Sequence, residues 1–393
     1  MNEIKYCKNC VIPETRPNTE IDDNGYCTAC KYFWEREKVN WSIRKQELLK
    51  IFNKYKSNKY YDCIVPSSGG KDSTYQVLKV KELGMNPLVV TITTDMLTTI
   101  GRKNIENLKN KGVDYIEYTL NPIVRKKINK FTLETVGDLT WSEEVGVSCS
   151  VVRIAIKMGI PLIVWGENSE NENGGPEKNS DFFDEIIQRH DGDWFEEFGG
   201  TNGLRSSDLL ELWSNEGITE LDLMPYTFPT KEEFKDNNIL GIFLGHYIPW
   251  DGHANAEFSI QNGLTTYHKW VEGNIVNYEN LDNYQMRVHD YFKFLKYGYD
   301  RVSDWSSLAI RRGRMKRSEA VEFSRIYGGK FPSEYLGMPL KNVLDYIGMD
   351  EKQFKIICEK FTNKKIFKKN PDGSLMYDNR GDLIKVNYDN VKK

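Results

Sequence analysis

The fold of this chain is decided by the stretch Tyr61-Asp-Cys-Ile-Val-Pro66, which runs directly into Ser67-Ser68-Gly69-Gly70-Lys71-Asp72-Ser73. The apolar residues up to Pro66 predict a short buried strand, and the residues from about Ser73 to Leu83 predict a helix. Between them, two glycines without a Cβ allow backbone N–H groups to close around phosphate oxygens, and the helix N-terminus adds partial positive charge. The stretch therefore predicts a phosphate-binding loop between a strand and a helix.

The side chains of this loop suit a nucleotide. Lys71 supplies a full positive charge, Ser68 and Ser73 supply hydroxyl donors, and Asp72 supplies an oxygen ligand for Mg²⁺. The spacing is not that of a Walker A loop, which needs four residues between its first Gly and the Gly-Lys pair. A tight turn with a Ser or Asp helix cap is the alternative interpretation. The complete pattern between a strand and a helix favours phosphate binding.

Further strands and helices alternate after this loop. Strands are predicted at 87–93, 115–118 and 161–165, and helices at 102–111, 123–136 and 149–158. Such alternation is typical of right-handed βαβ units, so we expect an α/β fold with a doubly wound parallel sheet. Ligands of such sheets bind at the carboxyl ends of the strands. The loops after residues 66, 94 and 165 should therefore line one site.

The chain divides into four predicted parts. Residues 1–34 form a cysteine-containing unit, residues 35–57 a linker helix, residues 58–330 the α/β domain, and residues 331–393 a helical extension with a helix near 341–361. An insertion is expected at about 168–260, and its Glu/Asn/Gly-rich beginning at 168–205 resembles a lid. Two more short strands are predicted, at 239–244 and at 265–270.

Four of the seven cysteines form two pairs near the N-terminus: Cys7-x-x-Cys10 and, sixteen residues later, Cys27-x-x-Cys30. Two such pairs fit a tetrahedral Zn²⁺ ion with a closed shell of thiolates, which is a structural and not a catalytic site. Binding of the metal would stabilise a segment too small to hold a core of its own. Labile redox pairs or disulfides are the alternatives, and spacing and compartment favour zinc.

Composition and charge exclude some classes of protein. The formal net charge of −3 lacks the basic surplus of a dedicated nucleic-acid binder, so a large RNA or DNA partner is not expected. The first ten residues lack the apolar run of a signal peptide, and the longest apolar runs have only the length of buried strands. We therefore expect a cytoplasmic protein without a membrane partner.

Polar residues follow the strand at 161–165 on the expected site face. Glu167 and Asn168 are candidates for substrate or metal contact, although they could only cap the next turn. Cys149 precedes the predicted helix at 149–158, where a thiol would be acidified. A buried small side chain is the alternative for Cys149, and it is the interpretation we favour.

Two later segments gather residues that suit a polar substrate. The segment Gly245-His246-Tyr-Ile-Pro-Trp250-Asp251-Gly-His253 has the aromatic and polar side chains of a sugar site, or of a packed loop. The run Ile310-Arg311-Arg-Gly-Arg314-Met-Lys-Arg317 can clamp a phosphate or a carboxylate, although most charge runs are solvated surfaces. The sequence predicts no metal site at His246.

The loop at 68–73 resembles the PP-loop of the adenine nucleotide α-hydrolase superfamily, written SGGxDS, at every fixed position. That resemblance implies a Rossmann-like ATP pyrophosphatase domain in which the loop holds the pyrophosphate end of ATP while a substrate oxygen attacks the α-phosphorus. AMP and pyrophosphate would be the by-products. Asp95, at the end of the second strand, matches the position of a nucleotide-contacting acidic residue in that superfamily.

Most of the chain resembles the N-acetyl sugar amidotransferases of bacterial surface-polysaccharide (LPS and O-antigen) and nonulosonic-acid biosynthesis. The resemblance covers about residues 7–320 and is carried by the features already quoted. They are the Cys₄ start with Cys10-Val-Ile-Pro13, the loop Pro66–Ser73, Pro161-Leu-Ile-Val-Trp-Gly-Glu167, Tyr247-Ile-Pro-Trp-Asp251, Lys296-Tyr-Gly-Tyr299 and Ile310–Ala320. Members of the family tend to have more than one cysteine near position 149 and an acidic residue where His246 stands, so no role is transferred to Cys149 or His246.

The resemblance implies conversion of an acetamido group on a sugar, free or nucleotide-linked, into an acetamidino group. AMP is transferred to the amide oxygen, and ammonia then expels AMP. The cofactors would be ATP, Mg²⁺ and a structural Zn²⁺. The implied catalytic residues are Lys71, Asp72 and Glu167; the nucleotide site is Ser67, Ser68, Gly69, Gly70, Lys71, Asp72, Ser73 and Asp95; the substrate site is Asn168, Trp250, Asp251, Arg311 and Arg314; the metal ligands are Asp72 for Mg²⁺ and Cys7, Cys10, Cys27 and Cys30 for Zn²⁺.

The source of ammonia is expected to be another protein. The sequence has neither an N-terminal nucleophilic cysteine nor a Gly-x-Cys-x-Gly elbow around Cys63 or Cys149, so a separate glutaminase subunit is predicted.

Two alternatives use the same residues differently. A tRNA-thiolating PP-loop enzyme would need a basic surface and reactive cysteines, and a non-enzymatic zinc-ribbon adaptor would leave the phosphate loop without a purpose.

Overall fold

The computed structural model describes residues 4–57, 60–167, 206–213 and 218–386. Its centre is a parallel sheet of five strands in the order β3-β2-β1-β4-β5. The strands are β1 (Cys63–Pro66), β2 (Pro87–Ile92), β3 (Asp114–Tyr118), β4 (Leu162–Trp165) and β5 (Leu240–Phe243). β1, β2 and β4 are almost entirely buried, as expected for parallel strands covered on both faces.

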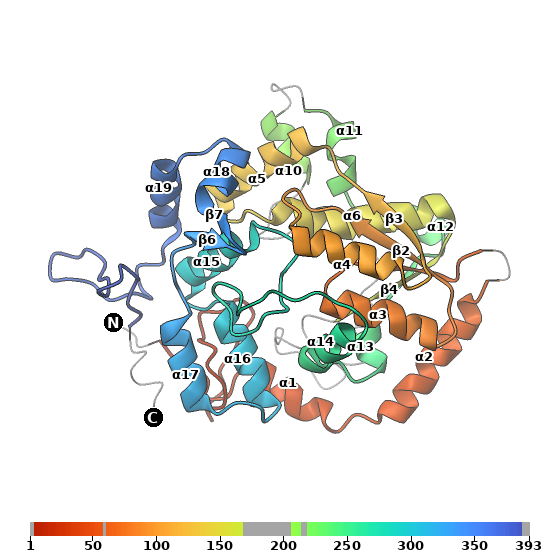
Figure 1. Cartoon of the computed structure of the whole chain (residues 1–393), viewed down its shortest axis with the longest axis horizontal. Coiled ribbons are helices and arrows are strands. Elements are labelled where there is room, and N and C mark those ends of the chain that lie inside the picture. Colours follow the sequence, from red (N-terminus) through yellow and green to blue (C-terminus); the bar gives the residue numbers. More distant parts are fainter. Residues whose placement is uncertain (1–3, 58–59, 168–205, 214–217, 387–393) are drawn as a thin grey trace.

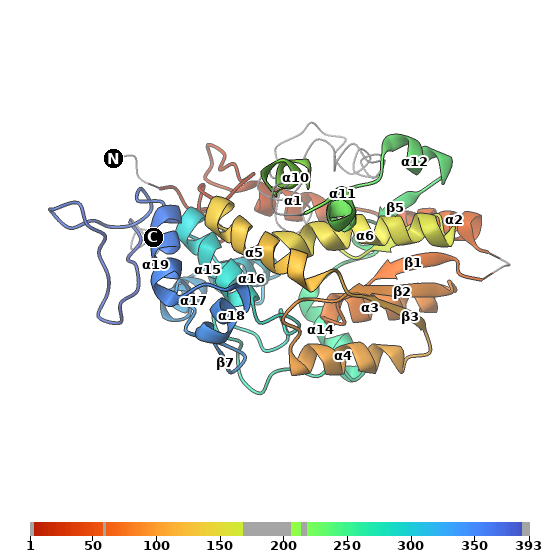
Figure 2. The ribbon, with the colours of Figure 1, turned by 90° about the horizontal axis from the view of Figure 1, so that it is seen from above.

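The helices around the sheet cover its two faces, as Figure 2 shows for α6 on one side and for α3 and α4 on the other. Alternate strand residues enter separate cores: Ile64 and Val90 pack in the core with α6, and Val65 and Val89 in the core with α3. The sheet is therefore doubly wound, and the predicted fold class is confirmed. The flanking helices are α3 (Lys71–Glu82), α4 (Thr99–Lys109), α5 (Pro122–Val136) and α6 (Trp141–Met158).

The remaining described elements surround this centre (Figure 1). The N-terminal part has α1 (Thr28–Arg36) and α2 (Trp41–Tyr55). Before and after β5 come α10 (Ser206–Trp213), α11 (Glu220–Leu223), η3 (Met224–Tyr226), α12 (Lys231–Asp236), α13 (Leu244–Tyr247) and α14 (Gly252–Gln261). The C-terminal part has α15 (Met286–Tyr297), α16 (Arg301–Arg311), α17 (Arg317–Ile326), β6 (Glu334–Tyr335), β7 (Met338–Pro339), α18 (Leu340–Ile347) and α19 (Glu351–Phe361).

Several predicted elements differ from the structure. No strand forms at 265–270; this segment is held instead by single contacts, such as the bond from the Tyr267 N–H to the Asn277 carbonyl at 2.8 Å. The helix predicted near 341–361 is two helices, because Gly348 ends α18 at a φ of +66° and Asp350 caps α19. The strand predicted at 239–244 is confirmed as β5, and it pairs with β4 as part of the main sheet.

None of the helices in the described residues is long and apolar enough to cross a membrane.

Candidate functional site

The predicted phosphate loop lies between β1 and α3, where the sheet ends in a tight turn. Gly69 has a φ of +78°, and a Cβ on it would lie 3.0 Å from the backbone nitrogen of Ile105. Only glycine adopts this backbone without strain so close to α4. The Gly69 N–H donates to Ser67 Oγ at 3.1 Å and the Gly70 N–H donates to Ser68 Oγ at 3.3 Å. α3 begins at Lys71, two residues earlier than predicted, so Lys71, Asp72 and Ser73 form its first turn.

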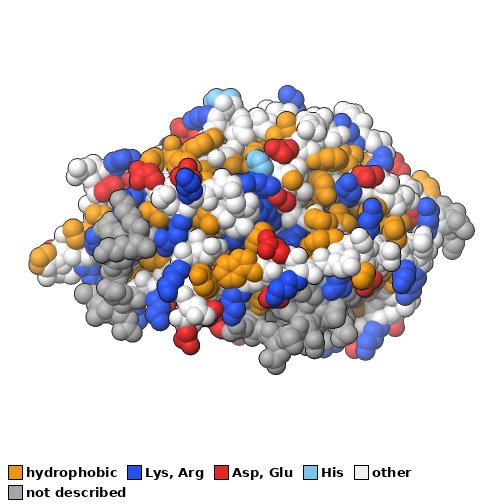
Figure 3. Space-filling view, turned by 90° about the horizontal axis from the view of Figure 1, so that it is seen from below, with side chains coloured by type: hydrophobic (Ala, Val, Ile, Leu, Met, Phe, Trp, Pro, Cys, Tyr) orange, Lys and Arg blue, Asp and Glu red, His pale blue; other side chains and the backbone are white. Residues whose placement is uncertain are grey.

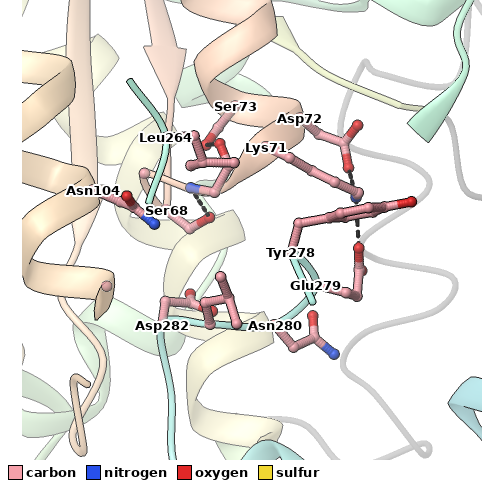
Figure 4. Close-up of a pocket in the computed structure, with 14 residues that line it drawn as sticks. Ser68, Lys71, Asp72, Ser73, Asn104, Leu264, Tyr278, Glu279, Asn280 and Asp282 are labelled. Atoms are coloured by element: carbon pink, nitrogen blue, oxygen red, sulfur yellow. Dashed lines mark hydrogen bonds and ion pairs between the residues drawn. The ribbon is translucent and has the colours of Figure 1, made fainter. Parts of the chain in front are cut away.

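A cavity of about 110 Å³ opens in front of this loop, and we call it the phosphate pocket. Loop residues 68–73 and residues Gly101 and Asn104 of α4 line one side of it, and residues 278–282 line the other (Figure 4). The loop residues that the sequence analysis assigned to the nucleotide thus lie around one cavity, with Ser67 buried behind them.

Lys71 carries the positive charge of the phosphate pocket, and it is tightly held. Its ammonium contacts the carboxylate of Asp72 and lies 2.7 Å from Glu279 Oε2 and 5.2 Å from the centre of the Trp305 ring. Burial alone would lower the pKa of Lys71, but Asp72 and then Glu279 outweigh it and raise the pKa above its ordinary value. The two carboxylates therefore favour the charged form of Lys71 at the edge of the pocket.

Asp72 fits a role as a magnesium ligand by its position and chemistry. Its side chain is 28% exposed, so part of the carboxylate faces the pocket. Asn255 Nδ2 of α14 donates to Asp72 Oδ1 at 2.8 Å and fixes its orientation. An oriented carboxylate beside a phosphate site is the type of oxygen ligand that Mg²⁺ takes in nucleotide enzymes.

Residues 277–282 lie against the phosphate pocket, which residues 278–282 line, and we call them the covering segment. The Thr98 N–H donates to the Asp282 carbonyl at 3.0 Å, and Leu97 pairs with Asn283 in an antiparallel bridge. The segment therefore packs against the loop that follows β2, at the carboxyl edge of the sheet. This segment was not predicted from the sequence. The run Asn277-Tyr-Glu-Asn-Leu-Asp-Asn-Tyr284, which has three asparagines and two carboxylates and no helix or strand periodicity, was the available signal.

A second and larger cavity, of about 530 Å³, lies beyond the covering segment, and we call it the arginine pocket. Asp251, Arg312 and Arg314 supply its charges, and Trp305 and Tyr278 are among its aromatic walls. Tyr278 also lines the phosphate pocket, so the two cavities share a wall. Asp251 and Arg314, which were predicted to bind substrate, lie together here. Arg312 belongs to the predicted arginine run but was not singled out as a substrate residue.

The charges of the arginine pocket are paired. Arg314 Nη1 donates to Asp251 Oδ1 at 2.8 Å, and Arg312 Nε lies 3.4 Å from the same oxygen. Burial would raise the pKa of Asp251, but the bond from Arg314 and the charge of Arg312 lower it to about 2. Asp251 also caps α14 by accepting from the His253 N–H at 3.1 Å. The pocket thus presents fixed charges against apolar and aromatic walls.

Two of the other residues predicted for the substrate, Trp250 and Arg311, have structural contacts. Trp250 is 2% exposed, and its carbonyl oxygen accepts hydrogen bonds from Arg36 Nη2 at 2.8 Å and from Arg312 Nη2 at 3.0 Å. Arg311 is buried on the side of the cysteine cluster, where its charge lowers the pKa of Cys10 after the larger effects of the neighbouring cysteines. Neither residue lines the arginine pocket.

The predicted residues at the other strand ends are spread more widely. Glu167 is exposed after β4, and its charge acts on Lys71. Asn168 lies outside the described residues. The side chain of Asp95 is 2% exposed, with Oδ1 3.1 Å from Arg125 Nε, and burial raises its pKa to about 6. In this structure Arg125 holds the Asp95 carboxylate, and a role for Asp95 in nucleotide binding stays a prediction.

The four N-terminal cysteines form one buried cluster whose sulfur atoms lie within 4.8 Å of one another. The Sγ atoms of Cys10 and Cys27 are 3.6 Å apart and those of Cys7 and Cys30 are 3.8 Å apart. A tetrahedral zinc ion with bonds of about 2.3 Å requires sulfur–sulfur distances of about 3.8 Å, whereas a disulfide requires about 2.05 Å. The cluster therefore has the dimensions of a closed zinc site.

Cys149 and His246 lie inside the protein. Cys149 is within α6, eight residues after its start, so the predicted helix start at residue 149 was wrong. Burial raises the pKa of its thiol to about 12, which agrees with the favoured interpretation as a core residue. His246 is 3% exposed on the short helix α13 and packs against Tyr247.

Comparison with known proteins gives one family match. Residues 265–380 match the family model of the LPS biosynthesis protein WbpG-like, C-terminal domain. This segment includes the covering segment and both arginines of the arginine pocket. No curated protein sequence matches the chain.

Solved structures resemble the chain only distantly. The NH3-dependent NAD synthetase from Campylobacter jejuni subsp. jejuni NCTC 11168, in complex with the nitrate ion, has a TM-score of 0.27 and 14% identity. That match covers 51% of this chain and 94% of the synthetase chain. The structure of gox2181 has a TM-score of 0.21 and 12% identity, and covers 50% of this chain and 98% of its own. Superpositions this loose carry no functional argument.

Proposed function

We propose that this chain is an ATP-dependent amidotransferase that converts an acetamido group of an N-acetylated sugar into an acetamidino group, with AMP and pyrophosphate as by-products. The observation that carries the proposal is the shared wall between the phosphate pocket and the arginine pocket, formed by Tyr278 beside Lys71 (Figure 4). A nucleotide in one cavity and an acceptor in the other would meet at this wall. The WbpG-like match to residues 265–380 supports a role in LPS biosynthesis.

The two cavities suit the two halves of such a reaction. An amide oxygen is a poor leaving group, so it must first be activated, and transfer of AMP to it gives an imidate that ammonia can attack. Lys71 and the backbone N–H groups of the loop would hold the departing pyrophosphate. Mg²⁺, held by Asp72, would supply further neutralising charge. The paired arginines and aromatic rings of the arginine pocket would orient the sugar.

The predicted partner is part of this proposal. We propose that ammonia comes from a separate glutaminase subunit, because the sequence carries no recognisable glutaminase motif. The purified chain should then use ammonium salts directly, and glutamine only after that subunit is added. Formation of the amidine from glutamine by the purified chain alone would contradict this part.

The alternative of tRNA thiolation is less well supported. Cys63, Cys149 and Cys358 are buried, and burial raises the pKa of each thiol above its ordinary value. A thiolating enzyme needs an accessible and acidic thiol. On the face seen in Figure 3, Lys and Arg side chains alternate with acidic and hydrophobic ones and form no continuous basic band. That face does not have the charge pattern of an RNA-binding surface.

Mass spectrometry tests the proposal. The protein is incubated with ATP, Mg²⁺, ammonium and a panel of acetamido sugars, both free and nucleotide-linked. Because an oxygen is replaced by N–H, each converted group should lose about one mass unit, with AMP and pyrophosphate formed in equal amounts. Lys71→Met should lower the rate about 100-fold or more, as expected for loss of a charge that stabilises the transition state. Lys103→Met, at an exposed position on α4, is the control and should leave the rate unchanged. Release of ADP and orthophosphate would refute the proposal.

A further inference from the structure

The charges around the phosphate pocket do not suit a free triphosphate. Its lining side chains include one cation, Lys71, and three carboxylates, Asp72, Glu279 and Asp282, which leave a formal net charge of −2 when all are ionised. The single cation already contacts two of these carboxylates. A polyanion entering this pocket alone would be repelled, so a cation must enter with it.

Glu279 is the carboxylate that the phosphate loop does not require. It comes from the covering segment, about two hundred residues after the loop, and its side chain is 14% exposed. The covering segment is held by other contacts, among them the Asp282 carbonyl with the Thr98 N–H and the Asn280 carbonyl with the Tyr335 hydroxyl at 2.9 Å. The covering segment thus has anchors besides the Glu279 carboxylate, which leaves the charge of Glu279 available for a role in the pocket.

Glu279 and Asp72 lie on opposite sides of one positive charge. Figure 4 shows the Lys71 ammonium between the two carboxylates, with an interaction to each. Two carboxylates that face a single cation beside a phosphate loop are also placed to bind a divalent metal, whose preferred ligands are oxygens. The ammonium of Lys71 therefore marks a position for positive charge that Mg²⁺ can take over when Lys71 contacts phosphate.

We infer that Glu279 makes nucleotide binding depend on a divalent cation. In the nucleotide-free protein Glu279 holds Lys71 and keeps the pocket negative. When Mg²⁺ enters with the triphosphate, Glu279 and Asp72 bind the metal and Lys71 is released to the phosphates. This inference rests on the proposed use of ATP and adds a second metal-binding residue to the site.

The test is ATP binding by the full-length protein, measured by calorimetry with Mg²⁺ and with EDTA, in the absence of sugar. Wild-type protein should bind ATP about tenfold or more tightly with Mg²⁺, since neutralising a nearby charge pair changes the interaction strongly. In Glu279→Gln the gain from Mg²⁺ should fall below about threefold, while binding in EDTA becomes several-fold tighter because one repelling charge is gone. Glu106→Gln, an exposed position on α4, is the control for loss of one negative charge and should behave as wild type.

The other outcomes are separable. If Glu279→Gln keeps the full gain from Mg²⁺, Glu279 is not a metal ligand and the inference is wrong. If its binding weakens equally with Mg²⁺ and with EDTA, the role of Glu279 is structural and the inference is also wrong. Binding of Mn²⁺ with ATP, followed by electron paramagnetic resonance, should show the same loss in Glu279→Gln. Absence of ATP binding by the wild-type protein in both solutions would instead refute the proposed function itself.

Discussion

Replacement of Gly69 by alanine tests the loop geometry directly. At a φ of +78°, an alanine incurs left-handed strain of about 1–2 kcal/mol. Its Cβ would also lie 3.0 Å from the Ile105 backbone nitrogen and 3.0 Å from its Cγ1, and the backbone atom cannot move away without displacing α4. Displacing packed atoms in this way adds about 1 kcal/mol.

The neighbouring glycine is a matched control. Gly70 has a φ of −72°, which any residue adopts, and an added Cβ would meet only Ser68 Oγ, at 3.2 Å. Both substitutions reduce the entropy of the unfolded chain by the same amount, so this effect cancels in the comparison. Gly69→Ala should therefore be less stable than Gly70→Ala by about 2–3 kcal/mol.

Urea unfolding followed by circular dichroism measures this difference. The urea midpoint should fall in Gly69→Ala. In Gly70→Ala the free energy of unfolding, obtained from the midpoint and the m-value, should stay within about 0.5 kcal/mol of wild type. Equal stability of the two variants would refute the described loop, because a loop that tolerates a Cβ at residue 69 cannot have the left-handed turn packed on α4.

Three further predictions follow from the described contacts. Cys10→Ser should reduce bound zinc from one equivalent per chain to less than about 0.1 by elemental analysis, because loss of one thiolate opens the shell; an unchanged zinc content would contradict the Cys₄ site. Burial raises the pKa of Asp282 to about 7 in the folded protein. Between about pH 4 and pH 7 the carboxyl is therefore ionised in the unfolded chain but not in the folded one, and the folded state loses stability as the pH rises. Asp282→Asn should remove this loss, so the melting temperature of the variant should exceed that of wild type by more at pH 8 than at pH 5. Arg314→Ala should raise the KM for the acetamido sugar about tenfold and leave the KM for ATP unchanged, because Arg314 lines only the arginine pocket of the two; equal changes in both constants would contradict separate binding sites.

The local features of the site were predictable because neighbouring residues determine them. The apolar run before Pro66, the two glycines and the following helix are contiguous, and the structure places them in the predicted order, with the helix beginning two residues early. The cysteine cluster was predictable for the same reason, because the two-residue spacing within each pair already indicates a tight metal-binding turn. Alternation of apolar strands with helices was sufficient to predict the doubly wound sheet.

The missed features depend on contacts between distant parts of the chain. Residues 277–282 reach the phosphate loop only because the chain returns to the edge of the sheet, and no local pattern encodes that return. The segment 265–270 has the β-branched and aromatic residues of a strand, but it finds no partner strand in the described structure.

The directions of the arginines near the end of α16 could not be predicted from the sequence either. Arg311 is the last residue of α16 and lies on the side of the cysteine cluster. Arg312 and Arg314 follow the helix and reach Asp251, because Gly313 reverses the backbone at a φ of +68°. The charge pattern does not show where the helix ends. It therefore could not predict that Arg311 points to the cysteine cluster while Arg312 and Arg314 point to Asp251.

The late position of the covering segment has a consequence for synthesis on the ribosome. The loop at 68–73 and the strands beside it emerge from the exit tunnel about two hundred residues before residues 277–282. During that interval the nascent chain exposes an incomplete cavity with its glycine turn uncovered. Translation products that stop before residue 277 would therefore lack one wall of the cavity, which is completed only after more than two thirds of the polypeptide has been made.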